Sequence, residues 1–361
     1  MVLKMLSSTV FLINGCKIIM CVSLLALSVF LSSCAGPPAA EPVLEARTAM
    51  ESADAVMGDW KGSWKLDDES DSGPLAAQVI ALGKEGYRAK SFSEFDTRQE
   101  PIAVLDGKRY GDAVRFAGEV ELSEGGTLEV EAVIKDGQFK GSFKGDEAGG
   151  FAMEKVIRVS PTLGAKPPAG AIVLFDGKNF KQWKHINKEP DADSVQWKLL
   201  KDGAMEVKKG TGSIVTKKKF ADFKLHVEFR TPFMPDARGQ GRGNSGVYLQ
   251  ERYEVQVLDS YGLEGEDNEC GGIYQVGAPM VNMCAPPTQW QSYDITFYAP
   301  GAERREAQVT VVHNGVTIHD NVSLPKPTGG ALDSDVTKAG GIYLQDHGNP
   351  VQYRNIWLVE L

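Results

Sequence analysis

A carboxylate and an amide stand two positions apart in the segment 253–258. Successive side chains of a β-strand point to opposite faces, so Glu254, Gln256 and Leu258 would share one face and the valines the other. A carboxyl group can transfer a proton, and a neighbouring amide suits sugar hydroxyls. We interpret this face as the wall of a groove, and a solvated sheet face is the alternative interpretation.

A histidine closes a second predicted strand, directly before a Gly-Asn-Pro turn. Alternation places Tyr343, Gln345 and His347 on one face of that strand. Because imidazole is the natural proton acceptor near neutral pH, His347 is a candidate general base. A histidine that only hydrogen-bonds the backbone of the turn is the alternative interpretation.

Three other histidines are expected at structural or surface positions. His226 stands mid-strand among core-like neighbours, which favours a structural role. His313 and His319 flank a predicted hairpin turn and are expected to be exposed. We recognise no Ser-His-Asp set, no HExxH helix and no calcium-binding loop in the sequence, so spacing alone assigns no metal ligand.

A glycine-rich stretch, residues 241–246, leads into the strand that carries Tyr248. Such a turn lets another group approach the backbone closely. A bulge or tight turn is the alternative interpretation. The stretch is not a phosphate-binding P-loop, because the Lys-Ser/Thr ending is missing.

The elements that must position these residues are short strands in two units. Residues 57–160 contain alternating segments separated by Asp-Gly turn signals, which predicts a small antiparallel β-barrel or sandwich. Residues 171–361 show similar strands, an Asn-Gly hairpin at 314–315 and no convincing helix, which predicts two packed sheets, a jelly-roll sandwich. A linker, residues 161–170, separates the units. The predicted strands are residues 60–64, 75–82, 87–92, 102–105, 113–120, 127–134, 138–143, 223–230, 246–249, 253–258, 293–298, 307–313 and 356–361.

The N-terminal residues 1–33 are predicted to be a lipoprotein signal peptide. They contain no acidic residue, and their apolar run is shorter than the about 20 residues of a membrane-spanning helix. The run ends at Leu-Ser-Ser-Cys, which resembles a bacterial lipobox, so Cys34 is predicted to carry the lipid. An ordinary signal peptide is the alternative. Residues 34–56 would be a tether, and the protein is expected in the bacterial cell envelope, held to a membrane by its anchor.

Two cysteines, Cys270 and Cys284, remain besides Cys34 when the signal peptide is removed. In an exported protein such a pair is expected to form a disulfide, and two free buried thiols are the alternative. No CxxC motif or nearby histidine cluster supports metal binding by this pair. The acidic residues 264–269 beside Cys270 are interpreted as a solvated loop.

The composition limits the partners. The 361 residues include 39 Lys and Arg and 48 Asp and Glu, a formal charge of −9. Nucleic acid is not expected as a partner, because binding phosphates requires a basic face. With 42% hydrophobic and 24% charged residues, the chain has the composition of a folded globular protein. Nothing in the sequence indicates its oligomeric state.

Seven motifs in order resemble the 3-keto-disaccharide hydrolase domain family, formerly a domain of unknown function. The motifs are Leu-Phe-Asp-Gly-Lys at 174–178 with Trp183, Asn-Ser-Gly-Val-Tyr at 244–248, Tyr-Glu-Val-Gln-Val-Leu-Asp at 253–259, Cys-Gly-Gly-Ile-Tyr at 270–274, Trp-Gln-Ser-Tyr-Asp at 290–294, His-Asn-Gly-Val at 313–316 and the run 344–357. The resemblance covers residues 171–361 and leaves the first unit outside. It implies a concanavalin A-like jelly-roll fold with a sugar-binding concave face.

The resemblance also implies activity on glycosides that carry a ketone at C3 of the sugar. The ketone acidifies the hydrogen on C2, a base removes that hydrogen, the enolate expels the aglycone from C1, and water later adds to the enone. The reaction needs a base, a group that stabilises the enolate oxygen and an acid for the leaving group. We expect such a carbohydrate-active enzyme, and a non-catalytic, lectin-like carbohydrate-binding lipoprotein is the alternative.

In that reaction His347 is the favoured base at C2, and Glu254 is the alternative base or the acid for the leaving group. The residues expected to bind substrate are Asn244, Gln256 and Gln345 for the hydroxyls, Tyr248 and Trp290 for the sugar ring, and Arg354 or, more weakly, Arg230 for the enolate oxygen. A bound divalent cation is the alternative stabiliser of the enolate, and no other cofactor is expected.

Overall fold

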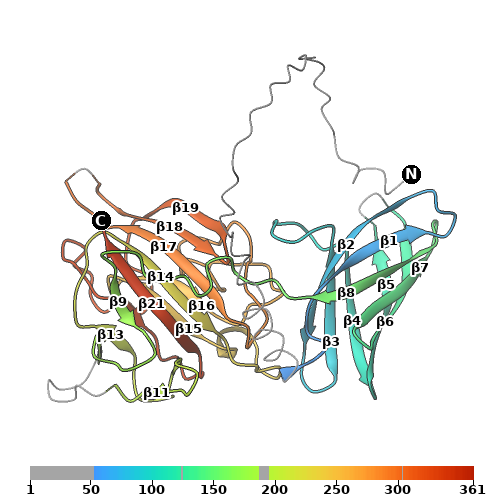
Figure 1. The fold of residues 1–361 in the computed structure, drawn as a ribbon. Helices are drawn as coiled ribbons and strands as arrows, with labels where there is room; N and C mark the ends of the chain where they lie inside the picture. Colours follow the sequence, from blue (N-terminus) through green and yellow to red (C-terminus); the bar gives the residue numbers. More distant parts are fainter. Residues whose placement is uncertain (1–52, 123–124, 187–194, 303) are drawn as a thin grey trace, which may run out of the picture.

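The computed structural model describes residues 53–122, 125–186, 195–302 and 304–361. The predicted signal peptide, the predicted lipidation site Cys34 and most of the predicted tether lie outside these residues. The described chain forms two β units, which Figure 1 shows as separate lobes joined by the segment after β8. Within the described ranges, no helix combines the length and the apolar character required to cross a membrane.

The first unit is a closed antiparallel barrel, in which each strand pairs with the next and β8 pairs back onto β1. Sequence alternation left a barrel or a sandwich open, and the structure has the barrel. The strands are β1 (Gly58–Leu66), β2 (Ser72–Ala81), β3 (Gly86–Phe92), β4 (Ala103–Tyr110), β5 (Ala113–Glu121), β6 (Thr127–Lys135), β7 (Gln138–Lys144) and β8 (Gly149–Val156).

Strand β8 is the one barrel strand that the sequence pattern missed. It begins with Gly149 and Gly150, a residue type with low strand propensity. Glycines in the barrel instead make room for aromatic rings. A Cβ at Gly141 would lie 2.5 Å from the Phe151 ring, and one at Gly107 would lie 2.4 Å from the Phe116 ring. The rings therefore occupy space that any larger side chain would fill, which bends the sheet tightly enough to close.

The second unit is a sandwich of two antiparallel sheets, which confirms the predicted all-β jelly-roll fold class. One sheet has five strands in the order β10-β13-β20-β15-β16, and the other has the order β11-β12-β21-β14-β17-β18-β19, with β9 paired to β21. Their bounds are β9 (Ile172–Phe175), β10 (Trp183–His185), β11 (Lys198–Leu199), β12 (Met205–Glu206), β13 (Ile214–Thr216), β14 (Phe223–Arg230), β15 (Ser245–Leu249), β16 (Tyr253–Val257), β17 (Gln291–Tyr298), β18 (Ala307–His313), β19 (Val316–Leu324), β20 (Tyr343–Leu344) and β21 (Gln352–Glu360). A 3-10 turn, η2 (Gly239–Gly241), precedes β15.

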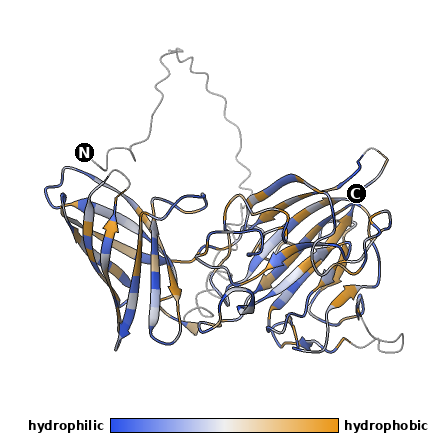
Figure 2. Cartoon of the chain, turned by 180° about the vertical axis from the view of Figure 1, so that it is seen from behind, coloured by the Kyte–Doolittle hydropathy of each residue, from blue (hydrophilic) through white to orange (hydrophobic). Residues whose placement is uncertain are grey.

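The core lies between the two sheets and is built by alternation along the strands, which Figure 2 shows as alternating hydrophobic and hydrophilic residues. Val255 and Val257 of β16 face the same buried cluster as Val227 and Phe229 of β14. The intervening residues of each strand point out of the sandwich. Each sheet therefore has an outer face, and the polar residues of interest lie on these two faces.

The predicted hairpin at 314–315 joins β18 and β19, with φ of 50° at Asn314 and 85° at Gly315. The expectation that His313 and His319 are exposed is wrong, because both are buried. Their side chains turn inward: His313 Nε2 lies 2.8 Å from Gln291 Oε1, and His319 Nε2 lies 2.8 Å from the Gly271 carbonyl. Burial lowers the pKa of His313 to about 3, so it is a neutral core residue.

The predicted disulfide is not shown: in the structure Cys270 and Cys284 are buried thiols with no bond between their sulfurs. The two thiols are hydrogen-bonded to each other, and each sulfur has a further polar contact. Cys270 Sγ lies 3.2 Å from Tyr293 Oη, and Cys284 Sγ lies 3.5 Å from the Leu258 carbonyl oxygen. Burial raises the pKa of the Cys284 thiol, which keeps it in the unreactive protonated form.

The barrel contacts the sandwich through a buried carboxylate, Asp59. Asp59 Oδ1 accepts a hydrogen bond from Tyr261 Oη at 2.6 Å, and Asp59 Oδ2 accepts one from Arg158 Nε at 2.8 Å. Nearer the surface, Lys90 forms an ion pair with Glu264 at 2.5 Å. These contacts bind the two units through charged groups at their shared surface.

Candidate functional site

The outer face of the five-stranded sheet brings together the carboxylate and the aromatic residue that the motifs singled out. Glu254 and Tyr248 lie opposite each other in the paired strands β16 and β15, on the face away from the core. Tyr248 Oη lies 2.8 Å from Glu254 Oε2 and 2.8 Å from the carbonyl oxygen of Gly329. Both side chains are almost completely buried, with 3% of Glu254 and 1% of Tyr248 exposed.

The Glu254 carboxyl group is held in its acid form at neutral pH. Burial raises its pKa to about 8, and the hydrogen bond with Tyr248 offsets only part of that effect. The hydroxyl of Tyr248 has one proton and two nearby acceptors. With Glu254 protonated, the carboxyl donates to Tyr248 and the tyrosine donates to Gly329. This arrangement is that of a carboxylic acid available for proton transfer near neutral pH.

Neighbouring residues extend this polar face. The ring of Tyr343 stacks on that of Tyr248, with centroids 4.3 Å apart and planes at 19°. Gln345 Nε2 donates to Tyr248 Oη at 3.3 Å. Within the described residues, Gln345 Oε1 is buried and has no hydrogen-bond partner, so the amide has an acceptor to offer a ligand.

Asn244 and Gln256 share the same end of this face, and both are tied to Gln240 in η2. Asn244 Nδ2 donates to the Gln240 carbonyl at 2.8 Å, and Gln256 Nε2 donates to Gln240 Oε1 at 3.1 Å. The Oδ1 atom of Asn244 is buried and unpaired in the described chain. Among the residues that the structure describes, this face thus carries two buried amide oxygens without partners, one on Asn244 and one on Gln345.

His347 lies at the rim of this face and is exposed, in the loop that follows β20. Its neighbours fix the loop. The Asp346 amide donates to Ser213 Oγ at 2.9 Å, and Asn349 Oδ1 accepts from the Asn244 amide at 2.8 Å. The structure therefore places His347 on the loop that also carries Gln345, beside the turn that holds Asn244.

A loop covers the pair formed by Tyr248 and Glu254. The Thr328 hydroxyl accepts a hydrogen bond from the Glu254 backbone amide at 2.9 Å, and the Gly329 carbonyl oxygen accepts one from the Tyr248 hydroxyl. Gly330 has a φ of 79°, and a Cβ there would lie 2.4 Å from Tyr248 Oη. A glycine is needed at this position for conformation and for space, and the loop shields Glu254 from water.

Trp290, Arg354 and Arg230 lie on the opposite, outer face of the eight-stranded sheet. The guanidinium groups of Arg354 and Arg230 lie over the Trp290 ring, 4.2 Å and 4.5 Å from its centroid. Arg354 Nε also donates to Glu228 Oε2 at 2.7 Å. The core of the sandwich separates these three residues from Glu254, since they belong to or adjoin the strands of the other sheet.

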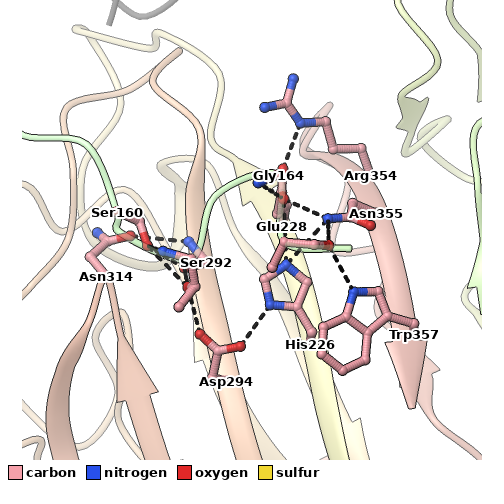
Figure 3. Close-up of polar contacts among 12 residues, drawn as sticks. Ser160, Gly164, His226, Glu228, Ser292, Asp294, Asn314, Arg354, Asn355 and Trp357 are labelled. Atoms are coloured by element: carbon pink, nitrogen blue, oxygen red, sulfur yellow. Dashed lines mark hydrogen bonds and ion pairs between the residues drawn. The ribbon is translucent and has the colours of Figure 1, made fainter. Parts of the chain in front are cut away.

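The same outer face carries a cluster that the sequence analysis did not identify, centred on His226 (Figure 3). His226 Nδ1 lies 2.7 Å from Asp294 Oδ1, and its Nε2 lies 3.4 Å from Glu228 Oε1. The Asn355 amide also donates to Glu228 Oε1, at 2.8 Å. His226 is buried, in line with the expected structural role, but beneath the interdomain linker instead of in the core. The alternation in residues 223–230 could have indicated this cluster, because it places His226 and Glu228 on the face opposite the aliphatic residues.

Charge within the cluster is stabilised by its own contacts. Burial disfavours the imidazolium of His226, but the hydrogen bonds to Asp294 and Glu228 outweigh it and raise its pKa to about 9. Burial likewise disfavours the Glu228 carboxylate, yet His226, Asn355 and Arg354 together lower its pKa to about 2. His226 and Glu228 are therefore both ionised at neutral pH, which suits an anchoring network and not a proton shuttle.

The described residues contain no group of three or more His, Cys, Asp and Glu side chains arranged to hold a metal ion. The acid-base chemistry available on the five-stranded sheet rests on Glu254 and, at the rim, His347. Amide groups surround them. This combination fits a ligand rich in hydroxyl groups that undergoes proton transfer.

Comparison with known proteins points in the same direction. Residues 170–359 match the family described as the 3-keto-alpha-glucoside-1,2-lyase-like domain. A candidate glycosyl hydrolase of Parabacteroides distasonis ATCC 8503 is 38% identical, covering 54% of this chain and 85% of its own, with a TM-score of 0.48. A second candidate glycosyl hydrolase of that organism is 22% identical, covering 53% of this chain and 94% of its own, with a TM-score of 0.41. No curated protein matches the chain.

Proposed function

Because the chain belongs, through residues 170–359, to the 3-keto-alpha-glucoside-1,2-lyase-like domain family, we propose that it cleaves glycosides whose sugar carries a ketone at C3. The observation that carries the proposal is the buried Glu254, hydrogen-bonded to Tyr248 on a face lined with amides. An ordinary glycosidase uses a pair of spaced carboxylates, whereas elimination next to a ketone needs one base and one acid.

The proposed reaction is an elimination followed by hydration. A base takes the proton from C2. The electron pair of the broken C2–H bond then forms the enolate, with the negative charge on the C3 oxygen. The enolate re-forms the ketone as the C1–oxygen bond breaks, and the leaving oxygen takes a proton from the acid. Water then adds to the resulting enone, with hydroxyl at C1 and hydrogen at C2. The products are a 3-keto sugar and the free aglycone.

Glu254 is assigned as the acid, because its pKa of about 8 keeps it protonated at neutral pH. His347, exposed at the rim, is assigned as the base at C2. If Glu254 instead removes the C2 proton, the two roles are exchanged. A sugar reaches Glu254 only when the covering loop around Gly329 shifts, since Tyr248 is bonded to it.

The remaining positions follow from the geometry. The unpaired oxygens of Asn244 and Gln345 accept hydrogen bonds from sugar hydroxyls. Arg354 and Arg230 lie on the other face, so the Gln345 amide nitrogen takes their proposed place as donor to the enolate oxygen. A divalent cation recruited with the substrate is the alternative donor of positive charge.

The test is release of 4-nitrophenol from 4-nitrophenyl 3-keto-glucoside by the purified protein. We expect release from the keto-glucoside and none from the parent glucoside, whose C2 hydrogen is not acidic. Glu254→Gln and His347→Ala should each lower kcat/KM by about 10²- to 10⁴-fold without lowering Tm. Glu360→Gln, a surface carboxylate paired with Lys218, is the matched control and should keep full activity.

Two results would count against the proposal. No release from the keto-glucoside, with saturable sugar binding in calorimetry, would make the protein a lectin-like binding module. Full activity in both the Glu254 and His347 variants would place the chemistry elsewhere. Repeating the assay with a chelator and with added divalent cations decides whether a cation takes part.

We also propose that the protein is an exported lipoprotein, supported by the residues preceding Cys34. Acylation of Cys34 would hold the two β units at a membrane of the cell envelope. Cys34→Ala should move the protein from the membrane fraction to the soluble fraction and remove the lipid mass from the mature N-terminus. An unchanged fractionation would refute the anchor.

A further inference from the structure

The interior of the barrel is not completely packed. It holds a cavity of about 670 Å³ among the inward-facing residues of its eight strands. The largest side chains of its wall are Trp64, Phe139, Phe143, Phe151 and Met153. An eight-stranded barrel is just wide enough either to be filled by side chains or to hold one small ligand. The interior of this barrel has room for a ligand.

Small residues on one side of the barrel create the space. Ala77, Ala89, Ser91 and Ala103 line the cavity on neighbouring strands β2, β3 and β4. They stand where larger residues would reach the aromatic wall formed by β7 and β8. The volume is thus a consequence of residue choice along three successive strands, and it lies in the range of cavities that bind small molecules.

The cavity has a floor and a mouth. At the floor, the Phe139 ring meets the rings of Trp60 and Phe116, with centroids 5.8 Å and 5.4 Å away. Ile102, which lines the cavity and is 39% exposed, marks the mouth, in the segment between β3 and β4. A ligand would enter past Ile102 and end against the aromatic floor.

The charges of the lining restrict the ligand. Two exposed carboxylates, Glu100 and Glu121, belong to the lining, and no lysine or arginine does among the described residues that form it. A buried anion needs a partner of opposite charge, so this mouth disfavours a fatty acid or another carboxylate. We propose that the barrel binds one uncharged apolar molecule, such as a medium-chain alcohol, at a site separate from the proposed glycoside site.

The test uses N-phenyl-1-naphthylamine, a neutral dye whose fluorescence rises in apolar surroundings, titrated into the purified protein in detergent-free buffer. We expect saturable binding of one dye per chain. Dodecanol should displace the dye, and dodecanoate at pH 8 should need an at least about tenfold higher concentration. Glu121→Lys should reduce the difference between the two displacing concentrations, because the added positive charge strengthens the binding of dodecanoate.

Variants place the binding inside the barrel. Ala89→Phe and Ser91→Phe add a ring inside the cavity and should each abolish dye binding. Val104→Phe adds the same ring on the outer surface, where Val104 is 46% exposed, and should leave binding unchanged. Glycoside cleavage should persist in all three variants, so failure here is distinguishable from failure of the proposed function.

Three results would overturn the inference. They are absence of saturable dye binding, equal displacement by dodecanoate and dodecanol, and dye binding that survives in both Ala89→Phe and Ser91→Phe while circular dichroism shows a native fold.

Discussion

The proton on Glu254 is controlled by a single neighbouring hydroxyl. Tyr248 can donate to the Gly329 carbonyl while Glu254 is protonated, and it can turn to Glu254 when the carboxyl ionises. The ionised form therefore gains a hydrogen bond that partly compensates for burial. Without this hydrogen bond from Tyr248, the pKa of Glu254 would be higher still.

Tyr248→Phe is thus expected to raise the pKa of Glu254 above its value of about 8. The carboxylate would lose its donor while burial remains. The limb of the kcat/KM pH profile that belongs to Glu254 should move to higher pH by about one unit, whether Glu254 is the acid or the base. Tyr343→Phe, which keeps the stacked ring, is the control and should leave the limb in place. A limb that stays in place or moves to lower pH in Tyr248→Phe would contradict this.

At the same scale, Cys270 and Cys284 should behave as free core thiols. We expect no reaction of the native protein with a thiol reagent and reaction of both in guanidinium without reductant, because burial alone protects them. Measuring thiols before and after unfolding checks this. Two thiols that appear only after reduction would instead establish the disulfide between Cys270 and Cys284.

Among the elements, the linker between the units and strands β14, β17 and β21 form one polar layer. Gly164 donates its backbone amide to Glu228 Oε1 at 2.5 Å, and the Ala165 carbonyl accepts from Trp357 Nε1 at 3.2 Å. Trp357 in turn stacks on His226, with centroids 5.0 Å apart. The linker is consequently packed as part of the sandwich surface.

This layer predicts a pH dependence of stability. The pKa of His226 is raised from its ordinary 6.5 to about 9, so its contribution is complete below 6.5 and is lost as pH rises through 9. The pKa of Glu228 is lowered from 4.5 to about 2, so its contribution is present above 4.5 and is lost as pH falls toward 2. The free energy of unfolding should fall by on the order of 1–3 kcal/mol between pH 6.5 and 9. Urea titrations across that range measure it, and His226→Gln should lack this loss.

Alternation predicted most strands and the polar face of β16, because residues two apart in a strand share a face whatever the fold. Asn244, Tyr248, Glu254 and Gln256 lie close together for the same local reason, since their strands are joined by a short turn. What alternation does not give is the sheet to which a strand belongs. Arg354 was therefore grouped with Glu254, although long-range pairing places β21 in the other sheet.

On the scale of the whole molecule, Asp59 links the barrel to the sandwich. It is a buried carboxylate that receives one hydrogen bond from Tyr261 of the sandwich and one from Arg158, which follows the last barrel strand. Removing one charge of such a pair leaves the other without its partner, which costs more than the loss of a surface ion pair.

Asp59→Asn is expected to destabilise the interface by about 2–4 kcal/mol and to split thermal unfolding into two transitions. Lys90→Gln is the control, because its partner Glu264 is 57% exposed and the pair should contribute less than about 1 kcal/mol. Differential scanning calorimetry of both variants makes the comparison. A single, unshifted transition in Asp59→Asn would show that the contact does not couple the units.

The packed linker limits how this protein can be taken apart by recombination. A gene fragment cut at residue 170 would contain the whole region that matches the family, yet it would leave behind the Gly164 amide and the Ala165 carbonyl that cap Glu228 and Trp357. The recipient protein would have to supply a substitute cap for a buried carboxylate. Descendants that inherit the sandwich in a new setting should therefore retain a stretch equivalent to 160–165, or carry compensating changes at Glu228.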